Sequence, residues 1–89
     1  MAVFISAVVP NQTTSGYDGM LNKLEDSLRQ APGFVAHFAY SSDGTWHTAE
    51  IWESARQASD FFANFVHPNL PPGVKPKRTV HELHSLVKE

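Results

Sequence analysis

Two ionisable residues in the segment 33–54 are of types that act together as a base and its orienting carboxylate. The segment contains two runs of alternating residues around Asp43-Gly44, a pair that favours tight hairpin turns because both residues reach positive φ easily. With a two-residue turn, His37 lies directly opposite Glu50, and such Cβ atoms are about 4.5–5.5 Å apart. A carboxylate at this distance fixes the imidazole tautomer and leaves the other ring nitrogen free to accept a proton. We therefore predict that His37 is a base and that Glu50 orients it.

Aromatic side chains accompany this pair. Trp46 and Trp52 are an even number of residues from Glu50, so all three face the same side of one strand. With Phe62 from the helix that follows, they form a flat apolar wall suited to a small apolar or aromatic ligand. We expect these three aromatic residues to position a substrate. The alternative is that the same residues only pack, as a satisfied His–Glu pair and core tryptophans.

The other histidines do not suggest a metal site. His81 and His84 are three residues apart, so on a regular strand they face opposite sides and cannot hold one ion together. We expect no metal and no cofactor, although five histidines offer axial ligands for a haem. His84 is included as a further substrate-binding residue in the cavity of His37.

Two strands and two helices besides the hairpin must position these side chains. Alternating apolar residues on both faces predict a central strand at the start of the chain. Capping hydroxyls followed by helical apolar spacing predict a first helix, and an S-x-x-Q capping box predicts the start of a second. The expected order is a strand over 2–9, a helix from 13–15 to Pro32-Gly33, the hairpin over 33–54, a helix from Ser54 to Pro68, and a strand over 78–87.

The two-residue turn also fixes the other cross-strand partners of the hairpin. It places Val35 opposite Trp52, on the same face as His37, and puts Phe34 on the opposite face. A longer turn through Ser41-Ser42 would shift the partners but would leave the faces of each strand unchanged.

This order of elements predicts a single α+β domain over residues 1–89 with a βαββαβ topology. Right-handed crossovers then give a four-stranded antiparallel sheet with both helices on one face, which is the ferredoxin-like arrangement. Large apolar groups on both hairpin faces leave the uncovered side of the sheet too apolar for water. A second copy of the chain is the simplest cover, so we expect a homodimer.

Composition narrows the class of protein. The chain has 42% hydrophobic and 18% charged residues and a formal net charge of -2, which is ordinary for a globular domain. Its densest basic group, Lys75, Lys77 and Arg78, lies in a proline-rich loop, and we interpret it as a solvated linker, with no nucleic-acid partner. Without cysteine there is no disulfide or thiolate chemistry, which fits a cytoplasmic protein. The apolar start is too short to span a membrane.

Several stretches resemble the dimeric α+β barrel superfamily, close to its antibiotic-biosynthesis-monooxygenase-like small domains in bacteria. They are Ala31-Pro-Gly-Phe-Val-Ala-His37, Asp43-Gly44-x-Trp46, Glu50-Ile-Trp-Glu-Ser54 and Val80-His-Glu-Leu-His84. The resemblance implies the barrel fold and a homodimer. The superfamily includes quinone-forming oxygenases, haem-degrading enzymes, isomerases and members without known catalysis. It therefore implies a cofactor-independent monooxygenase, or another proton-abstracting enzyme, acting on a small aromatic or polyketide-like compound. The alternative is a non-catalytic ligand-binding or structural homodimer.

Overall fold

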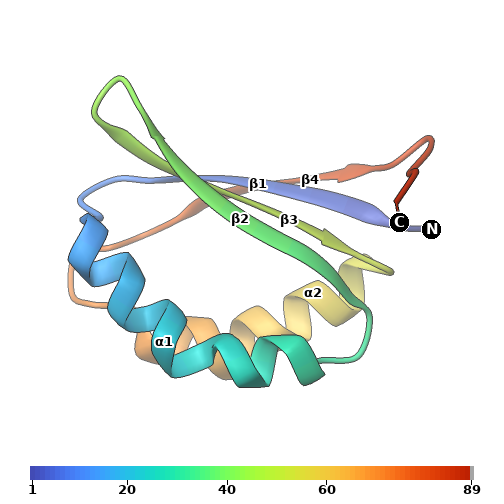
Figure 1. Ribbon diagram of the computed structural model, residues 1–89, viewed down its shortest axis with the longest axis horizontal. Helices are drawn as coiled ribbons and strands as arrows, with labels where there is room; N and C mark the ends of the chain where they lie inside the picture. The colour runs from blue at the N-terminus through green and yellow to red at the C-terminus, as the bar shows by residue number, and fades with distance from the viewer. Residues whose placement is uncertain (89) are drawn as a thin grey trace.

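The computed structural model of the chain describes residues 1–88, and within them it has the predicted βαββαβ order. The four strands form one antiparallel sheet in the order β2-β3-β1-β4, and both helices lie below the same face of it (Figure 1). The ferredoxin-like α+β prediction is thereby confirmed. The elements are β1 (Val3–Val9), α1 (Thr14–Gln30), β2 (Phe34–Ser42), β3 (Thr45–Trp52), α2 (Ala55–Phe61), a π-helical turn η1 (Phe62–Val66), a 3₁₀ turn η2 (His67–Asn69) and β4 (Lys77–Glu82).

Helix α1 begins and ends where the local sequence predicts. The Thr13 side chain accepts a hydrogen bond from the backbone N–H of Gly16 at 3.0 Å, which satisfies one of the free donors at the helix start. At the other end, Gly33 has a φ of 82° and lies so close to the Gln57 side chain that a Cβ there would overlap Gln57 Oε1. The positive φ therefore favours glycine at this turn, and a side chain here would also displace the end of the Gln57 side chain.

The second helix starts as predicted but continues further. Ser54 caps α2 by accepting from the Gln57 N–H at 3.2 Å. The helix then widens into η1 and narrows into η2, so Pro68 lies within the last turn and does not end the helical segment. The prediction at Pro68 was wrong because proline, which lacks an N–H, is tolerated in the first turn of a helical piece. π-Helical turns are often found at functional sites, and η1 borders the cavity described below.

The hairpin has the predicted turn and, over most of its length, the predicted register. Asp43 and Gly44 have φ values of 52° and 76°, and His37 pairs with Glu50. A β-bulge between Phe34 and Ala36 then places Phe34, not Val35, opposite Trp52. The predicted Val35–Trp52 pair was wrong because the bulge adds one residue to β2 and reverses the face of the residue beyond it.

The last strand is shorter than predicted. β4 pairs with β1 as far as Glu82 opposite Val3, and one further bond joins the Leu83 N–H to Ala2 O at 2.9 Å. Residues 83–88 are not in a strand. The predicted strand over 78–87 was too long because its regular pairing ends with β1, which begins at Val3.

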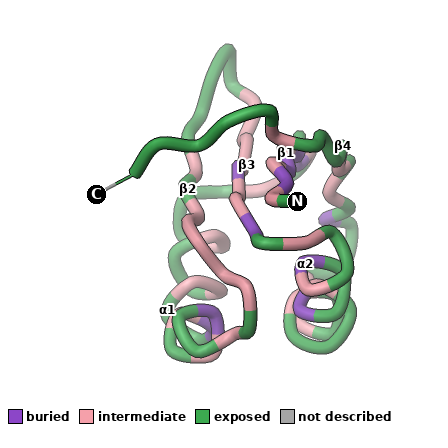
Figure 2. The backbone as a smooth tube through the Cα atoms, turned by 90° about the vertical axis from the view of Figure 1, so that its right-hand side faces the viewer, coloured by how far each residue is buried: buried purple, intermediate pink, exposed green. Residues whose placement is uncertain are grey.

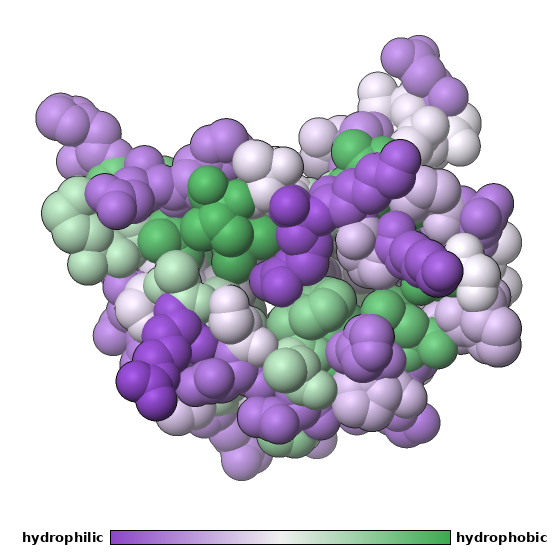
Figure 3. All heavy atoms as spheres, turned by 180° about the vertical axis from the view of Figure 1, so that it is seen from behind, coloured by the Kyte–Doolittle hydropathy of each residue, from purple (hydrophilic) through white to green (hydrophobic). Residues whose placement is uncertain are grey.

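The core lies between the sheet and the helices. Figure 2 shows the buried segments on the sides of the two layers that face each other, and hydrophobic atoms are also visible between these layers from behind (Figure 3). Trp52 is fully buried there, and the Phe34 ring packs edge-on against it at 5.4 Å between centroids. The buried core residues are Val3, Ile5, Leu28, Trp52, Ala58 and Phe61, with a second cluster of Ala7, Val9 and Val74.

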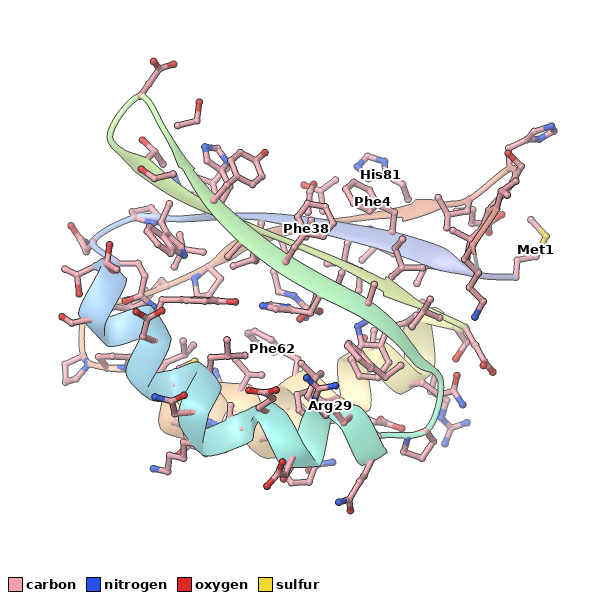
Figure 4. The ribbon with its side chains drawn as sticks, viewed as in Figure 1. Met1, Phe4, Arg29, Phe38, Phe62 and His81 are labelled. Atoms are coloured by element: carbon pink, nitrogen blue, oxygen red, sulfur yellow. The ribbon has the colours of Figure 1, made fainter. Side chains whose placement is uncertain are left out.

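No helix covers the other face of the sheet in the part of the chain that the structure describes. Phe38 and Tyr40 are each 51% exposed there, and Phe4 and His81 lie stacked beside each other on this side (Figure 4). We call this side the open face. Within residues 1–88, none of the helices has the length and apolar character needed to cross a membrane.

Candidate functional site

A cavity of about 90 Å³ lies between the helix-covered face of the sheet and the two helical segments. Phe62 extends from the helical layer into the space beneath the sheet (Figure 4). Most of the wall is apolar, and the polar atoms are concentrated at a few positions. The ionisable or aromatic residues of the wall are Tyr17, His37, Trp46, Glu50, Phe61, Phe62 and Arg78.

His37 and Glu50 form a hydrogen-bonded pair on this wall. His37 Nδ1 lies 2.9 Å from Glu50 Oε2, and the two side chains are only 14% and 17% exposed. The Trp52 indole N–H donates to the other carboxylate oxygen, Oε1, at 3.1 Å. Burial by itself would raise the pKa of Glu50, but the hydrogen bonds from His37 and Trp52 and the nearby cationic groups hold it below its ordinary value. Glu50 is therefore ionised at neutral pH, with both oxygens occupied.

Tyr17 on α1 completes this chain of hydrogen bonds, and the sequence analysis did not assign it a role. Its hydroxyl lies 2.7 Å from His37 Nε2, and its ring is parallel to the imidazole within 7°. With Nδ1–H donating to Glu50, Nε2 accepts from the phenol, so the nitrogen that we expected to be free is occupied. Burial, followed by the negative charges of Glu50 and Asp18, raises the pKa of Tyr17 to about 12. One signal in the sequence pointed to this contact, namely a tyrosine within the apolar stripe of a helix. A buried tyrosine hydroxyl usually has a hydrogen-bond partner, so Tyr17 was a candidate for a contact with the site.

Arg78 was also assigned wrongly, as part of a solvated linker. It lies on the helix-covered face of β4 opposite Ala7, and its side chain is only 20% exposed. Its guanidinium carbon is 4.1 Å from the centre of the Phe62 ring. Its Nη2 atom is 4.0 Å from Glu50 Oε1, which is too long for a hydrogen bond. The assignment failed because strand alternation turns Arg78 inward, whereas Lys77 faces the open side.

Of the remaining predicted site residues, Trp46 lines the cavity, whereas Trp52 and His84 do not. Trp46 lines the cavity and packs against Tyr17 at 5.4 Å between ring centroids. Trp52 is not part of the wall, and it acts on the site only through its bond to Glu50. His84 is exposed beyond the end of β4 and does not line the cavity. The predicted strand over 78–87, which contained His84, ends at Glu82.

The described residues do not offer an obvious place for a metal or a haem. Residues 1–88 contain no group of three or more His, Asp or Glu side chains that could hold an ion. Pockets for drug-sized ligands occupy roughly 300–1,000 Å³. The cavity of about 90 Å³ is below this range, although a more open hollow of about 590 Å³ also borders His37, Tyr17 and Trp46. Both ring nitrogens of His37 are engaged in hydrogen bonds.

Comparison with solved structures identifies the fold. No family model matches the chain, and no curated protein matches it. The structure is similar to protein YJCS, with a TM-score of 0.65 and 15% identity over 93% of this chain and 99% of that chain. It is similar to SnoaB from Streptomyces nogalater, a cofactor-independent oxygenase, with a TM-score of 0.63 and 12% identity over 99% of this chain and 97% of SnoaB.

A third similar structure is the heme-degrader MhuD from Mycobacterium tuberculosis, which has two hemes bound in its active site. The TM-score is 0.63 and the identity 15%, over 99% of this chain and 100% of MhuD. At these identities the likeness establishes the fold. It is the ferredoxin-like α+β fold that SnoaB and MhuD share, which agrees with the fold that the sequence resemblance implied.

Proposed function

We propose that the protein removes a proton from a small, largely apolar ligand, with His37 as the base and Glu50 as the carboxylate that orients it. The observation that carries this proposal is the continuous chain of hydrogen bonds from Tyr17 through His37 and Glu50 to Trp52 at the wall of an apolar cavity. Such a chain fixes the imidazole ring and its tautomer, and a carboxylate partner stabilises the imidazolium that forms.

In the proposed step a ligand C–H or O–H bond breaks and the proton moves to His37 Nε2, while the bonding electron pair stays on the ligand. The Tyr17 hydroxyl must first yield this nitrogen, or pass the proton along by giving its own hydrogen to Nε2. Trp46 and Phe62 position the ligand, and Trp52 supports Glu50. The apolar wall keeps water from competing for the proton.

Cofactor-independent oxygenation of an aromatic or polyketide-like compound is the specific form of this chemistry that we favour. In that reaction the deprotonated substrate itself gives an electron to oxygen, so the protein supplies deprotonation and desolvation. Support comes from the fold shared with SnoaB, a cofactor-independent oxygenase. The cavity limits the size of the ligand, because about 90 Å³ is less than the roughly 150 Å³ cavity that accepts benzene. A substrate with a full ring would also extend into the more open hollow that Tyr17, His37 and Trp46 border.

The second candidate is a non-catalytic ligand-binding or structural protein. Two observations favour it: Tyr17 already satisfies the second nitrogen of His37, and the cavity is small. In both candidates we propose a homodimer in which the open face of one sheet covers that of a second copy, because Phe38 and Tyr40 are half-exposed there. A cytoplasmic location is part of the same proposal.

Deuterium exchange of the α-hydrogens of nitroethane, followed by proton NMR, tests proton removal directly. We expect the protein to accelerate the exchange and His37→Gln to reduce this acceleration by about 10²–10⁴-fold, the usual contribution of a positioned base. His84→Gln is the matched control, because His84 is exposed outside the cavity, and it should leave the rate unchanged. Binding of nitroethane without accelerated exchange would favour the non-catalytic candidate.

A further inference from the structure

Two buried hydrogen-bond donors on the cavity wall have no acceptor among residues 1–88. They are the indole N–H of Trp46 and the Nη2 atom of Arg78. Both side chains line the same cavity. Buried donors in folded proteins are nearly always paired, and leaving part of a charged group without a partner is especially unfavourable. Acceptor atoms of a ligand bound in the cavity are therefore the partners that these two side chains lack.

Glu50 does not supply this acceptor. Its Oε2 is engaged with His37 at 2.9 Å, and its Oε1 accepts from Trp52 at 3.1 Å. The distance of 4.0 Å from Oε1 to Arg78 Nη2 gives electrostatic attraction without a hydrogen bond. The Glu50 carboxylate therefore partly neutralises the charge of Arg78 and leaves the N–H donors of Arg78 available to a ligand.

Phe62 holds the guanidinium of Arg78 in place without using its N–H groups. The guanidinium carbon lies over the Phe62 ring, 4.1 Å from its centre, where the negative face of the ring attracts the cation. Burial lowers the pKa of Arg78 from its ordinary value, and only the charge of Glu50 opposes this effect. A second negative charge in the cavity would, like Glu50, favour the charged form of Arg78.

We propose that Trp46 and Arg78 form an oxyanion-binding subsite, which holds the delocalised anionic oxygen of a small planar ligand beside His37. This inference rests on the proposed function, because proton removal by His37 creates such an oxyanion. The substrate class is then an acid whose C–H or O–H group lies next to a carbonyl or nitro group. When His37 takes the proton, the electron pair delocalises onto the ligand oxygen, which accepts hydrogen bonds from Trp46 and Arg78.

This division of charge matches the groups of the site, which are one arginine, one carboxylate and a histidine that becomes cationic only when it takes the proton. After proton transfer, the imidazolium of His37 is paired with Glu50, and the oxyanion is paired with Arg78. A planar, delocalised anion also suits the fork of donors on a guanidinium. The volume of about 90 Å³ favours a ligand of few non-hydrogen atoms within this cavity.

Propionate and propionamide provide the test, because they have the same shape and differ in the anionic charge. Isothermal titration calorimetry should show that propionate binds about tenfold more tightly, the equivalent of one favourable charge-assisted hydrogen bond. Arg78→Met keeps an apolar stem against Phe62 and should abolish this preference. Arg56→Met removes an exposed arginine from α2 and is the matched control, with an unchanged preference.

Equal affinity of the unmodified protein for the two compounds would overturn the subsite, and this comparison does not depend on any variant. A preference that persists in Arg78→Met would also overturn it. If this variant does not fold, Arg78→Lys serves in its place, with a reduced preference expected because the planar fork is lost. A preference without nitroethane exchange supports the subsite and counts against proton removal, whereas exchange without a preference overturns the subsite alone.

Discussion

The phenol hydroxyl of Tyr17 on α1 lies 2.7 Å from Nε2 of His37 on β2. This contact joins the helical layer to the sheet at the wall of the cavity. It also occupies the nitrogen that a base would use. The same hydrogen bond therefore supports the fold and controls access to the proposed base, which makes Tyr17 the most informative residue to change.

Removing only this hydroxyl separates its two roles. Tyr17→Phe keeps the packing against Trp46 and should lower the free energy of unfolding by about 1 kcal/mol, the typical net value of one hydrogen bond. Because Nε2 of His37 becomes free, nitroethane exchange should be at least as fast as in the unmodified protein. Urea unfolding and the NMR assay measure the two effects. A large loss of exchange would instead show that the hydroxyl relays the proton. Tyr40→Phe, on the open face, is the control.

The raised pKa of Tyr17 also predicts that the protein loses stability in alkali. Its pKa is raised from 10.0 to about 12 in the folded state, so folding favours the neutral phenol. The resulting stabilisation is complete below pH 10 and is lost as the pH rises from 10 to about 12. Melting temperatures across this range should fall less steeply for Tyr17→Phe. If the melting temperatures of the two proteins fell equally steeply with pH, Tyr17 would not have a raised pKa in the folded state.

The lowered pKa of Glu50 predicts that the protein loses stability as the pH falls in acid. Its pKa is lowered from 4.5 in the folded state, so the stabilisation is present above about pH 4.5 and is lost as the pH falls through the folded value. Glu50→Gln should lower the free energy of unfolding at pH 7 by about 1.5–3 kcal/mol, since hydrogen bonds to a charged group are lost. The variant should also lose stability less steeply in acid, as measured by urea titration. The exposed Glu53→Gln is the control and should behave like the unmodified protein.

The open face predicts self-association. Light scattering should give a mass of twice 9.9 kDa, and Phe38→Glu should shift it to the monomer, because a carboxylate would be buried against the apolar partner face. Val87→Glu adds the same charge at a residue that is 95% exposed outside the sheet and should leave the dimer intact. A monomer mass for the unmodified protein would refute the dimer.

Two glycines with similar backbone angles should respond differently to alanine. Gly33 and Gly44 have φ values of 82° and 76°, so each alanine substitution costs about 1–2 kcal/mol from the left-handed conformation. A Cβ at Gly33 would also overlap the Gln57 side chain, whereas nothing lies within 4 Å of one at Gly44. Chemical unfolding should therefore show the larger loss for Gly33→Ala. Equal losses would mean that Gln57 moves away without cost.

Local patterns were sufficient to predict most of the architecture. Apolar periodicity identified the helices and strands, and the hydroxyls of Thr13 and Ser54 marked the helix starts, because these features depend on residues adjacent in the chain. The pairing of His37 with Glu50 was also predictable, since a two-residue turn at Asp43-Gly44 fixes the partners of both strands. The bulge beside Phe34 was not, because it depends on how the strand end packs against Trp52.

The tertiary structure alone decided which residues complete the candidate site. Tyr17 meets His37 across 20 positions of sequence, and Arg78 meets Phe62 only because β4 lies over the helical layer. No local rule links residues so far apart, since their contact depends on how α1 and η1 pack beneath the sheet. His84 does not line the cavity, and Trp52 contacts the site only through its hydrogen bond to Glu50. The sequence by itself thus determined the fold and the His37–Glu50 pair, whereas packing between layers determined what surrounds that pair.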